Sequence, residues 1–165
     1  MTTDELSTHG MVRMDEEAIR GFLSSQSVGV LGLPTEGAPA LRPMSFWFDG
    51  DSRLYFFYLV GSSSRKTDLS KQTTIARFLV YRAETPFNWR SVLLAGPISE
   101  VPDDERESLE ESAELSGRPD LLERASTAEN TRFYQLHIEE QSGIKHLGLP
   151  SGFANEDTAD EDTIE

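Results

Sequence analysis

The sequence contains no cysteine and only three histidines. Without cysteine the chain forms no disulfide and offers no thiolate nucleophile, no Cys-ligated zinc and no iron–sulfur cluster. His9, His137 and His146 have a spacing that matches no common metal motif. We therefore predict no metal site.

Long apolar runs are also absent. No run reaches the roughly 18 residues that span a bilayer, and residues 1–5 lack the basic start and apolar core of a secretion signal. The chain shows no G-x-G-x-x-G fingerprint and no β-α-β alternation, which argues against a doubly wound nucleotide-binding sheet. We expect a cytoplasmic protein with no membrane partner.

Lysine is scarce and acidic residues dominate, with a formal net charge of −14 over 165 residues. The negative charge lies in the N-terminal segment, in residues 103–123 and in residues 156–165, whereas residues 26–101 hold eight Lys/Arg against six Asp/Glu. Such a surface is typical of a halophilic cytoplasmic protein, or of an ordinary acidic protein with a disordered acidic tail. No basic stripe is present to follow a nucleic-acid backbone, so we expect no nucleic-acid partner.

Turn residues separate short runs of β-forming residues along most of the chain. Asp15 is predicted to cap a short helix that places Ile19, Phe22 and Leu23 on one face. Further helices are predicted over residues 64–72 and 103–125. The predicted strands cover residues 27–33, 40–48, 53–59, 73–81, 89–101 and 131–139, with a short last one over 143–147.

Short connections between these strands favour antiparallel neighbours, and a closed barrel hides the sheet edges. The fold class predicted is mainly β: a six-stranded antiparallel barrel with flanking helices. The predicted parts are a flexible N-terminal arm over residues 1–12, the barrel domain over 13–149 and a disordered acidic tail over 150–165.

An aromatic strand ends in a Gly/Ser loop that brings Ser64, Arg65 and Lys66 to a predicted helix start. Backbone N–H groups at a helix N-terminus, backed by Arg and Lys, form a site for a phosphate-sized anion. Cations oppose the helix dipole at that end unless an anion compensates. We interpret the loop as an anion site; the alternative is a solvated helix start with two surface cations.

Three motifs, in this order, make the chain resemble the FMN-binding split β-barrel proteins, the pyridoxamine 5′-phosphate oxidase-like family. They are LRPMSF at residues 41–46, the run from FY at 57–58 through SRK at 64–66 to a leucine at 69, and RSVLLAG at 90–96. The resemblance covers residues 15–137. It implies a split β-barrel that forms a homodimer, with FMN bound between the subunits.

The resemblance also implies roles for residues on the phosphate side of the cofactor. Ser64, Arg65 and Lys66 would hold the FMN phosphate. Arg42 would add a further cation to it. Tyr58 would lie beside the ribityl chain or the phosphate.

On the ring side, the resemblance implies that Pro43, Met44 and Ser45 line the isoalloxazine edge. Arg90 and Ser91 would reach the flavin from the facing strand, across the dimer interface. No catalytic acid or base is predicted, because hydride transfer by a flavin needs no protein nucleophile.

The function that the resemblance implies is an FMN-dependent oxidoreductase for a small organic substrate, with NAD(P)H as a candidate electron donor. Ser91 stands where the oxidases have a glutamine, residues 60–63 lengthen the loop, and no C-terminal Arg-x-Arg is present. These departures argue against oxidation of pyridoxamine phosphate itself. The alternatives are a deazaflavin-dependent reductase on the same fold and a non-enzymatic flavin- or haem-binding module.

Overall fold

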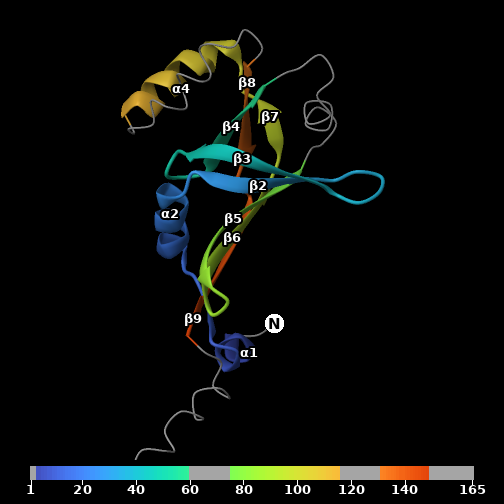
Figure 1. The fold of residues 1–165 in the computed structure, drawn as a ribbon. Coiled ribbons are helices and arrows are strands. Elements are labelled where there is room, and N and C mark those ends of the chain that lie inside the picture. The colour runs from blue at the N-terminus through green and yellow to red at the C-terminus, as the bar shows by residue number, and fades with distance from the viewer. Residues whose placement is uncertain (1–2, 60–74, 116–130, 149–165) are drawn as a thin grey trace, which may run out of the picture.

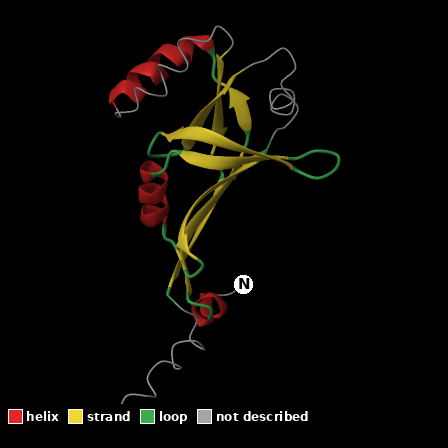
Figure 2. Cartoon of the chain, viewed as in Figure 1, coloured by secondary structure: helices red, strands yellow, loops and turns green. Residues whose placement is uncertain are grey.

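The computed structural model describes residues 3–59, 75–115 and 131–148 (Figure 1). Most of these residues lie in strands, and helices flank the strands (Figure 2). The helices are α1 (Thr3–Thr8), α2 (Glu16–Ser25) and α4 (Asp103–Leu115). The strands are β1 (Met11–Arg13), β2 (Val28–Leu33), β3 (Ala40–Phe48), β4 (Arg53–Leu59), β5 (Ala76–Thr85), β6 (Asn88–Gly96), β7 (Ile98–Glu100), β8 (Thr131–His137) and β9 (Glu140–Leu147).

All strand pairs in the described residues are antiparallel, in the order β1-β9-β6-β5-β2-β3-β4-β8-β7. The chain bends at Gly96 and Pro97, so that β6 pairs with β5 and β9 while β7 pairs with β8. At this bend the N–H of His137 donates to the Pro97 carbonyl at 3.0 Å, and that of Glu139 donates to the Ala95 carbonyl at 3.0 Å. These contacts close the sheet into the six-stranded antiparallel barrel that the sequence predicts.

The barrel core forms from alternate residues of each strand, as a half-buried strand requires. Phe78 lies at its centre, edge-on to Phe46 with ring centroids 5.4 Å apart and stacked on Phe56 at 6.0 Å. Leu54 and Leu136 are fully buried beside these rings. Each such side chain contributes about 1.5–3 kcal/mol by leaving water, so this alternation drives the folding of the barrel.

Helix α2 packs on the barrel through the face that the sequence predicts. The Asp15 carboxylate accepts a hydrogen bond from the Ala18 N–H at 2.8 Å, which satisfies one of the free donors of the first turn. Ile19, Phe22 and Leu23 are all buried in the main core. The predicted cap and apolar face are both confirmed.

A tight turn joins β3 and β4. The Asp49 carboxylate accepts from the N–H groups of Asp51, Ser52 and Arg53, at 2.8–3.1 Å. Gly50 has a φ of +89°, a conformation that residues with a Cβ rarely adopt. The turn therefore fixes how β3 and β4 pair.

The N-terminal segment differs from the predicted arm. Residues 3–8 form α1, with Leu6 buried, and β1 pairs with β9 so that Met11 lies opposite His146. A helix and a strand this short leave too few residues for a periodic hydrophobic pattern, which is why neither was predicted. The predicted helix over residues 64–72 and the predicted tail over 150–165 lie outside the described residues.

A smaller cluster lies under α4. Val101 and Phe133 are buried there, and Tyr55 and Leu109 pack against them. The Arg106 guanidinium lies 4.8 Å from the centre of the Phe133 ring, a cation–π contact.

Among the described helices, none combines the length and the apolar character that a membrane crossing needs.

The barrel closure predicts a strong effect of one substitution. In Gly96→Ala the new methyl group would overlap the carbonyl oxygen of His137, which is held by the β8 backbone. We expect the free energy of unfolding to fall by about 2–3 kcal/mol, as for other overpacked sites, measured by equilibrium urea denaturation. Gly37→Ala is the control, because a Cβ at Gly37 meets no atom within 4 Å. Equal stability of the two variants would contradict this account of the closure.

Candidate functional site

The barrel opens between β3 and β4. The two strands pair only from Phe46 opposite Phe56 to Phe48 opposite Leu54. Beyond that point, in the described residues, β3 stays paired with β2 and β4 stays paired with β8. The predicted ring-side residues of β3 therefore lie along one side of this opening.

The β3 residues at the opening alternate between the two faces of the strand. Met44 is buried with Phe46 on the core side, whereas Pro43 and Ser45 are exposed on the outer side. Arg42 continues the core-side row and is exposed. The structure thus places all four predicted residues on one strand, but on two faces of it.

The backbone of β3 directs alternate polar groups toward the opening. The Phe46 N–H donates to the Ser27 carbonyl at 2.9 Å, so the polar groups of Met44 and Arg42 also point toward β2, because the ladder alternates. Those of Ser45 and Pro43 point the other way, where β4 has turned off. Pro43 has no N–H, so it fits this position without breaking a ladder bond. In the described residues the β3–β4 pairing ends at Phe46 opposite Phe56, so the Ser45 N–H and the Pro43 carbonyl point toward the opening.

Arg42 supplies an uncompensated positive charge at the same place. Its Nη1 donates to the Leu41 carbonyl at 3.2 Å, a group on the unpaired side of the ladder. In the part of the chain that the structure describes, no carboxylate lies within ion-pair distance of it. In a protein with a net charge of −14, an exposed cation with no ion-pair partner among the described residues favours an anionic ligand.

The phosphate-side residues are placed only in part. Tyr58 lies on β4 opposite Arg132. It is one residue before the end of the described range 3–59, and the next described range begins at residue 75. Ser64, Arg65 and Lys66 lie in the gap, outside the described residues, and their role stays a prediction.

Arg90 and Ser91 lie on β6, which β2 and β5 separate from β3. With strands about 4.8 Å apart, Ser91 is about 14 Å from β3 in the same chain. Ser91 faces outward in a row with Tyr81 and Ile144, whereas Arg90 points to the opposite face of the sheet. One chain alone does not bring this pair to the opening.

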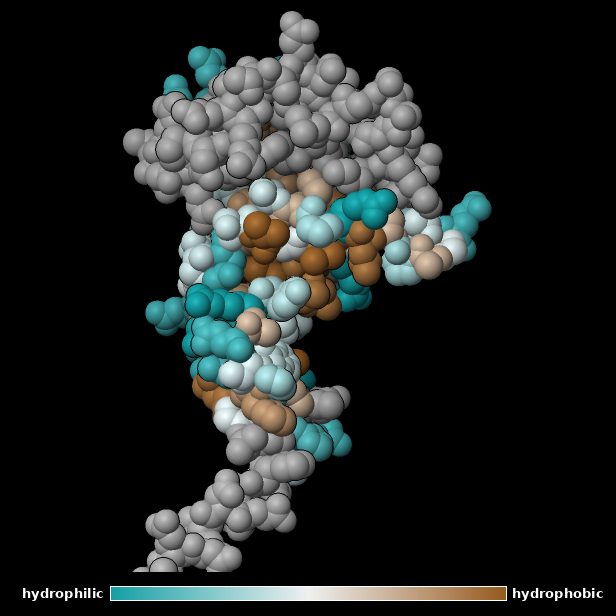
Figure 3. All heavy atoms as spheres, viewed as in Figure 1, coloured by the Kyte–Doolittle hydropathy of each residue, from teal (hydrophilic) through white to brown (hydrophobic). Residues whose placement is uncertain are grey.

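The outer face of the sheet around Ser91 is apolar. Val28, Leu41 and Tyr81 are 56%, 58% and 57% exposed, and Figure 3 shows hydrophobic side chains gathered over β2 and β3. Val30 and Leu79 lie between them in the same outward register. A contiguous exposed apolar surface of this kind is typical of a protein–protein contact.

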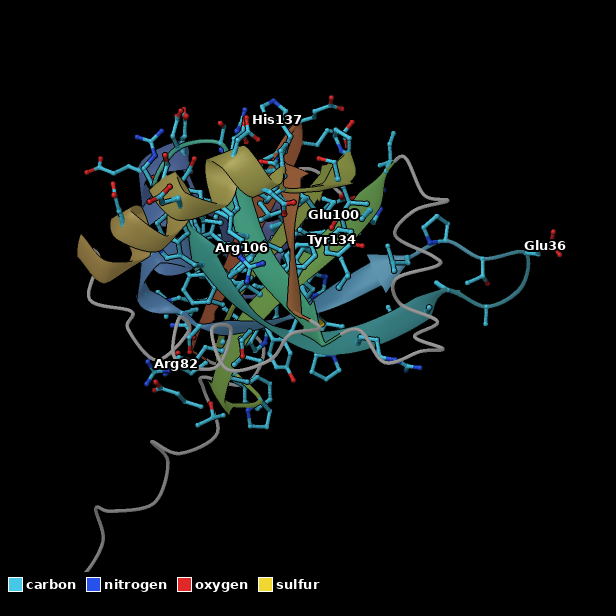
Figure 4. All side chains as sticks on the ribbon, turned by 90° about the horizontal axis from the view of Figure 1, so that it is seen from above. Glu36, Arg82, Glu100, Arg106, Tyr134 and His137 are labelled. Atoms are coloured by element: carbon cyan, nitrogen blue, oxygen red, sulfur yellow. The ribbon has the colours of Figure 1, made fainter. Side chains whose placement is uncertain are left out.

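Two histidines differ in environment. His137 is exposed, at the side of the molecule opposite Arg82 (Figure 4). His146, which the sequence did not single out, is buried, with Nδ1 2.8 Å from the Phe87 carbonyl and its ring stacked on Trp89 at 5.6 Å. These contacts give His146 a packing role.

Sequence reasoning missed a polar pocket around Arg90. Its volume is about 280 Å³, and it lies between the end of α2 and the β5–β6 hairpin. Arg82 and Glu84 also line it. Only the register between β5 and β6 places these side chains beside Arg90, and a single sequence does not give that register.

With this geometry in view, the comparisons with known proteins are direct. The family model described as pyridoxamine 5′-phosphate oxidase matches residues 15–145. The chain belongs to this family, and the resemblance that the three motifs indicate is confirmed. The comparison with curated proteins gave no match.

Solved structures share the fold. An FAD-binding protein from Mesorhizobium loti is 22% identical with a TM-score of 0.66, the match covering 82% of this chain and 97% of that one. The flavocytochrome Anf3 from Azotobacter vinelandii is 22% identical at 0.64, over 86% of this chain and 71% of that one. The FAD and heme binding protein from Mycobacterium smegmatis is 18% identical at 0.62, over 86% and 75%. These likenesses confirm the predicted split β-barrel.

Proposed function

We propose that the protein binds FMN at the opening between β3 and β4 and acts as an oxidoreductase on a small organic substrate. The observation that carries the proposal is the arrangement of Arg42 with the backbone groups of Ser45 and Pro43 that point toward the opening. Family membership supports it, as do the flavins that the similar solved proteins bind. Neither fixes the substrate, which we propose only as a class.

The residues at the opening fit such a cofactor. Arg42 and the cationic motif of Arg65 and Lys66 would neutralise the phosphate, with the Ser64 hydroxyl as a further donor. The Ser45 N–H and the Pro43 carbonyl would meet one donor and one acceptor on the polar edge of the ring. Met44, buried beneath them, holds this stretch of β3 against the core.

A bound flavin supplies hydride or electron transfer, and the protein supplies anchoring and orientation. The chain's own contribution is therefore electrostatic and positional. Arg42 opposes the phosphate charge, and the β3 backbone sets the height and tilt of whatever lies against it. NAD(P)H is the proposed electron donor. No residue is assigned as a catalytic acid or base.

We also propose that the protein works as a homodimer. The outer face with Val28, Leu41 and Tyr81 would be the contact, because its burial removes exposed apolar surface from water. Ser91 lies on this same face. A second copy can thus bring its Ser91 toward a flavin that the first copy holds, a contact that the distance within one chain prevents.

The cofactor proposal predicts a coloured protein that releases FMN on denaturation, identified by absorbance and mass. Arg42→Gln should weaken FMN binding about tenfold or more, since a hydrogen bond to a charged group is worth about 1.5–3 kcal/mol. The double variant Arg65→Ala/Lys66→Ala should weaken it further. Affinities are measured by fluorescence titration of the protein after the cofactor has been removed.

The matched control is Arg20→Gln, which removes the same charge from an exposed position paired with Glu16 on α2. Its FMN affinity should equal that of the parent protein. Release of FAD, deazaflavin or haem in place of FMN would replace the cofactor assignment. Full FMN affinity in both the Arg42 and the Arg65/Lys66 variants would contradict the site.

The dimer proposal predicts that Val28→Glu weakens self-association about tenfold or more, since a buried carboxylate without a partner is strongly unfavourable. Light scattering after size-exclusion chromatography measures the mass. Val12→Glu is the control, because Val12 is also an exposed valine, 49% exposed on β1. A monomeric parent protein, or a dimer that survives Val28→Glu, would refute the proposed interface.

A further inference from the structure

The pocket beside α2 is lined mainly by polar side chains. Ser25 and Gln26 come from the end of α2, Arg82 and Glu84 from β5, and Asn88 and Arg90 from β6. A volume of about 280 Å³ lies just under the range of drug-sized ligand sites, so the pocket suits a small metabolite rather than a dinucleotide. The buried ring of Phe22 adds an apolar wall.

Three cations lie in a row across the sheet, and two of them, Arg82 and Arg90, line this pocket. Arg82 is opposite Arg90, and Arg90 is opposite Lys145, on adjacent strands and on the same face. Directly opposed side chains have Cβ atoms about 4.5–5.5 Å apart, and like charges at that spacing destabilise a sheet. The row therefore works against folding unless an anion offsets the repulsion.

The protein itself offsets little of this charge. Glu84 pairs with Arg82 at 3.0 Å, but both side chains are more than half exposed, so the pair is weak. Arg90 has no ion-pair partner among the residues that the structure describes. A chain with a net charge of −14 has many acids, yet among the described residues Glu84 is the one acid that lines the pocket with the two arginines.

We infer that this pocket binds the carboxylate of a small organic acid, with Arg90 as the main ligand and Arg82 as the second. The planar guanidinium matches a carboxylate with two parallel hydrogen bonds. The amides of Gln26 and Asn88 can bond the remaining oxygen lone pairs. Glu84 repels a second negative charge, which favours a monoanion over a phosphate ester. The site is on the face of the sheet opposite Ser91, and the inference does not depend on the proposed flavin.

The first test compares benzoate, phenyl phosphate and neutral benzamide, which share a phenyl ring and differ in charge. Calorimetric titration of the purified protein, with whatever cofactor it carries, should show binding in the order benzoate, phenyl phosphate, benzamide. Trp89 lines the pocket, and Trp47→Phe leaves it as the sole tryptophan. Its fluorescence in that variant should change with benzoate at the concentration that the calorimetry gives. Benzamide binding as tightly as benzoate, or an unchanged Trp89 signal, would overturn the inference.

The second test separates a binding role of Arg90 from a structural one. Arg90→Gln should weaken benzoate binding about tenfold or more, and should raise the melting temperature of the ligand-free protein because it relieves the repulsion. Glu84→Gln should reduce the preference for benzoate over phenyl phosphate. Arg20→Gln, the charge-matched control on α2, should change neither the benzoate affinity nor the melting temperature. Unchanged benzoate affinity in Arg90→Gln, or a lower melting temperature, would refute the role of this row of charges.

Discussion

The fold depends on the contact between the Gly96 backbone and the carbonyl of His137. Because no side chain lies between them, β6 can pair with β5 and β9 before the bend, and β7 can pair with β8 after it. With β8 held there, β4 follows β8 over its full length while β3 follows β2. The opening between β3 and β4 is thus a result of the closure on the other side of the barrel.

Much of this fold was predictable from local signals. The bounds of β2, β3 and β4 agree with the predicted strands to within a residue, because alternating apolar residues and turn residues such as Asp49 and Gly50 mark them. β5 was predicted to end at residue 81 but runs to Thr85. Its last residues are exposed on both faces, so they lack the alternation that a strand in a core shows.

The site was less predictable, for reasons of geometry. A motif places Arg90 and Ser91 side by side in the sequence, but a strand sends neighbouring side chains to opposite faces. Their separation follows from strand period alone. In the row of charges, Arg82 meets Arg90 across a local hairpin, whereas Lys145 joins them through pairing with a segment more than 50 residues away, which no local pattern encodes.

Pro43 has a consequence for what the opening can accept. Among the described residues, the side of β3 that β4 leaves has no further strand paired to it, and such strand edges recruit extended chains, including those of neighbouring molecules. An added strand needs an N–H at every second residue, and Pro43 withholds one in the middle of the edge. Pro43 therefore disfavours the addition of a neighbouring chain as a further strand at this edge. Its carbonyl can still accept a hydrogen bond from a ligand that is not a peptide.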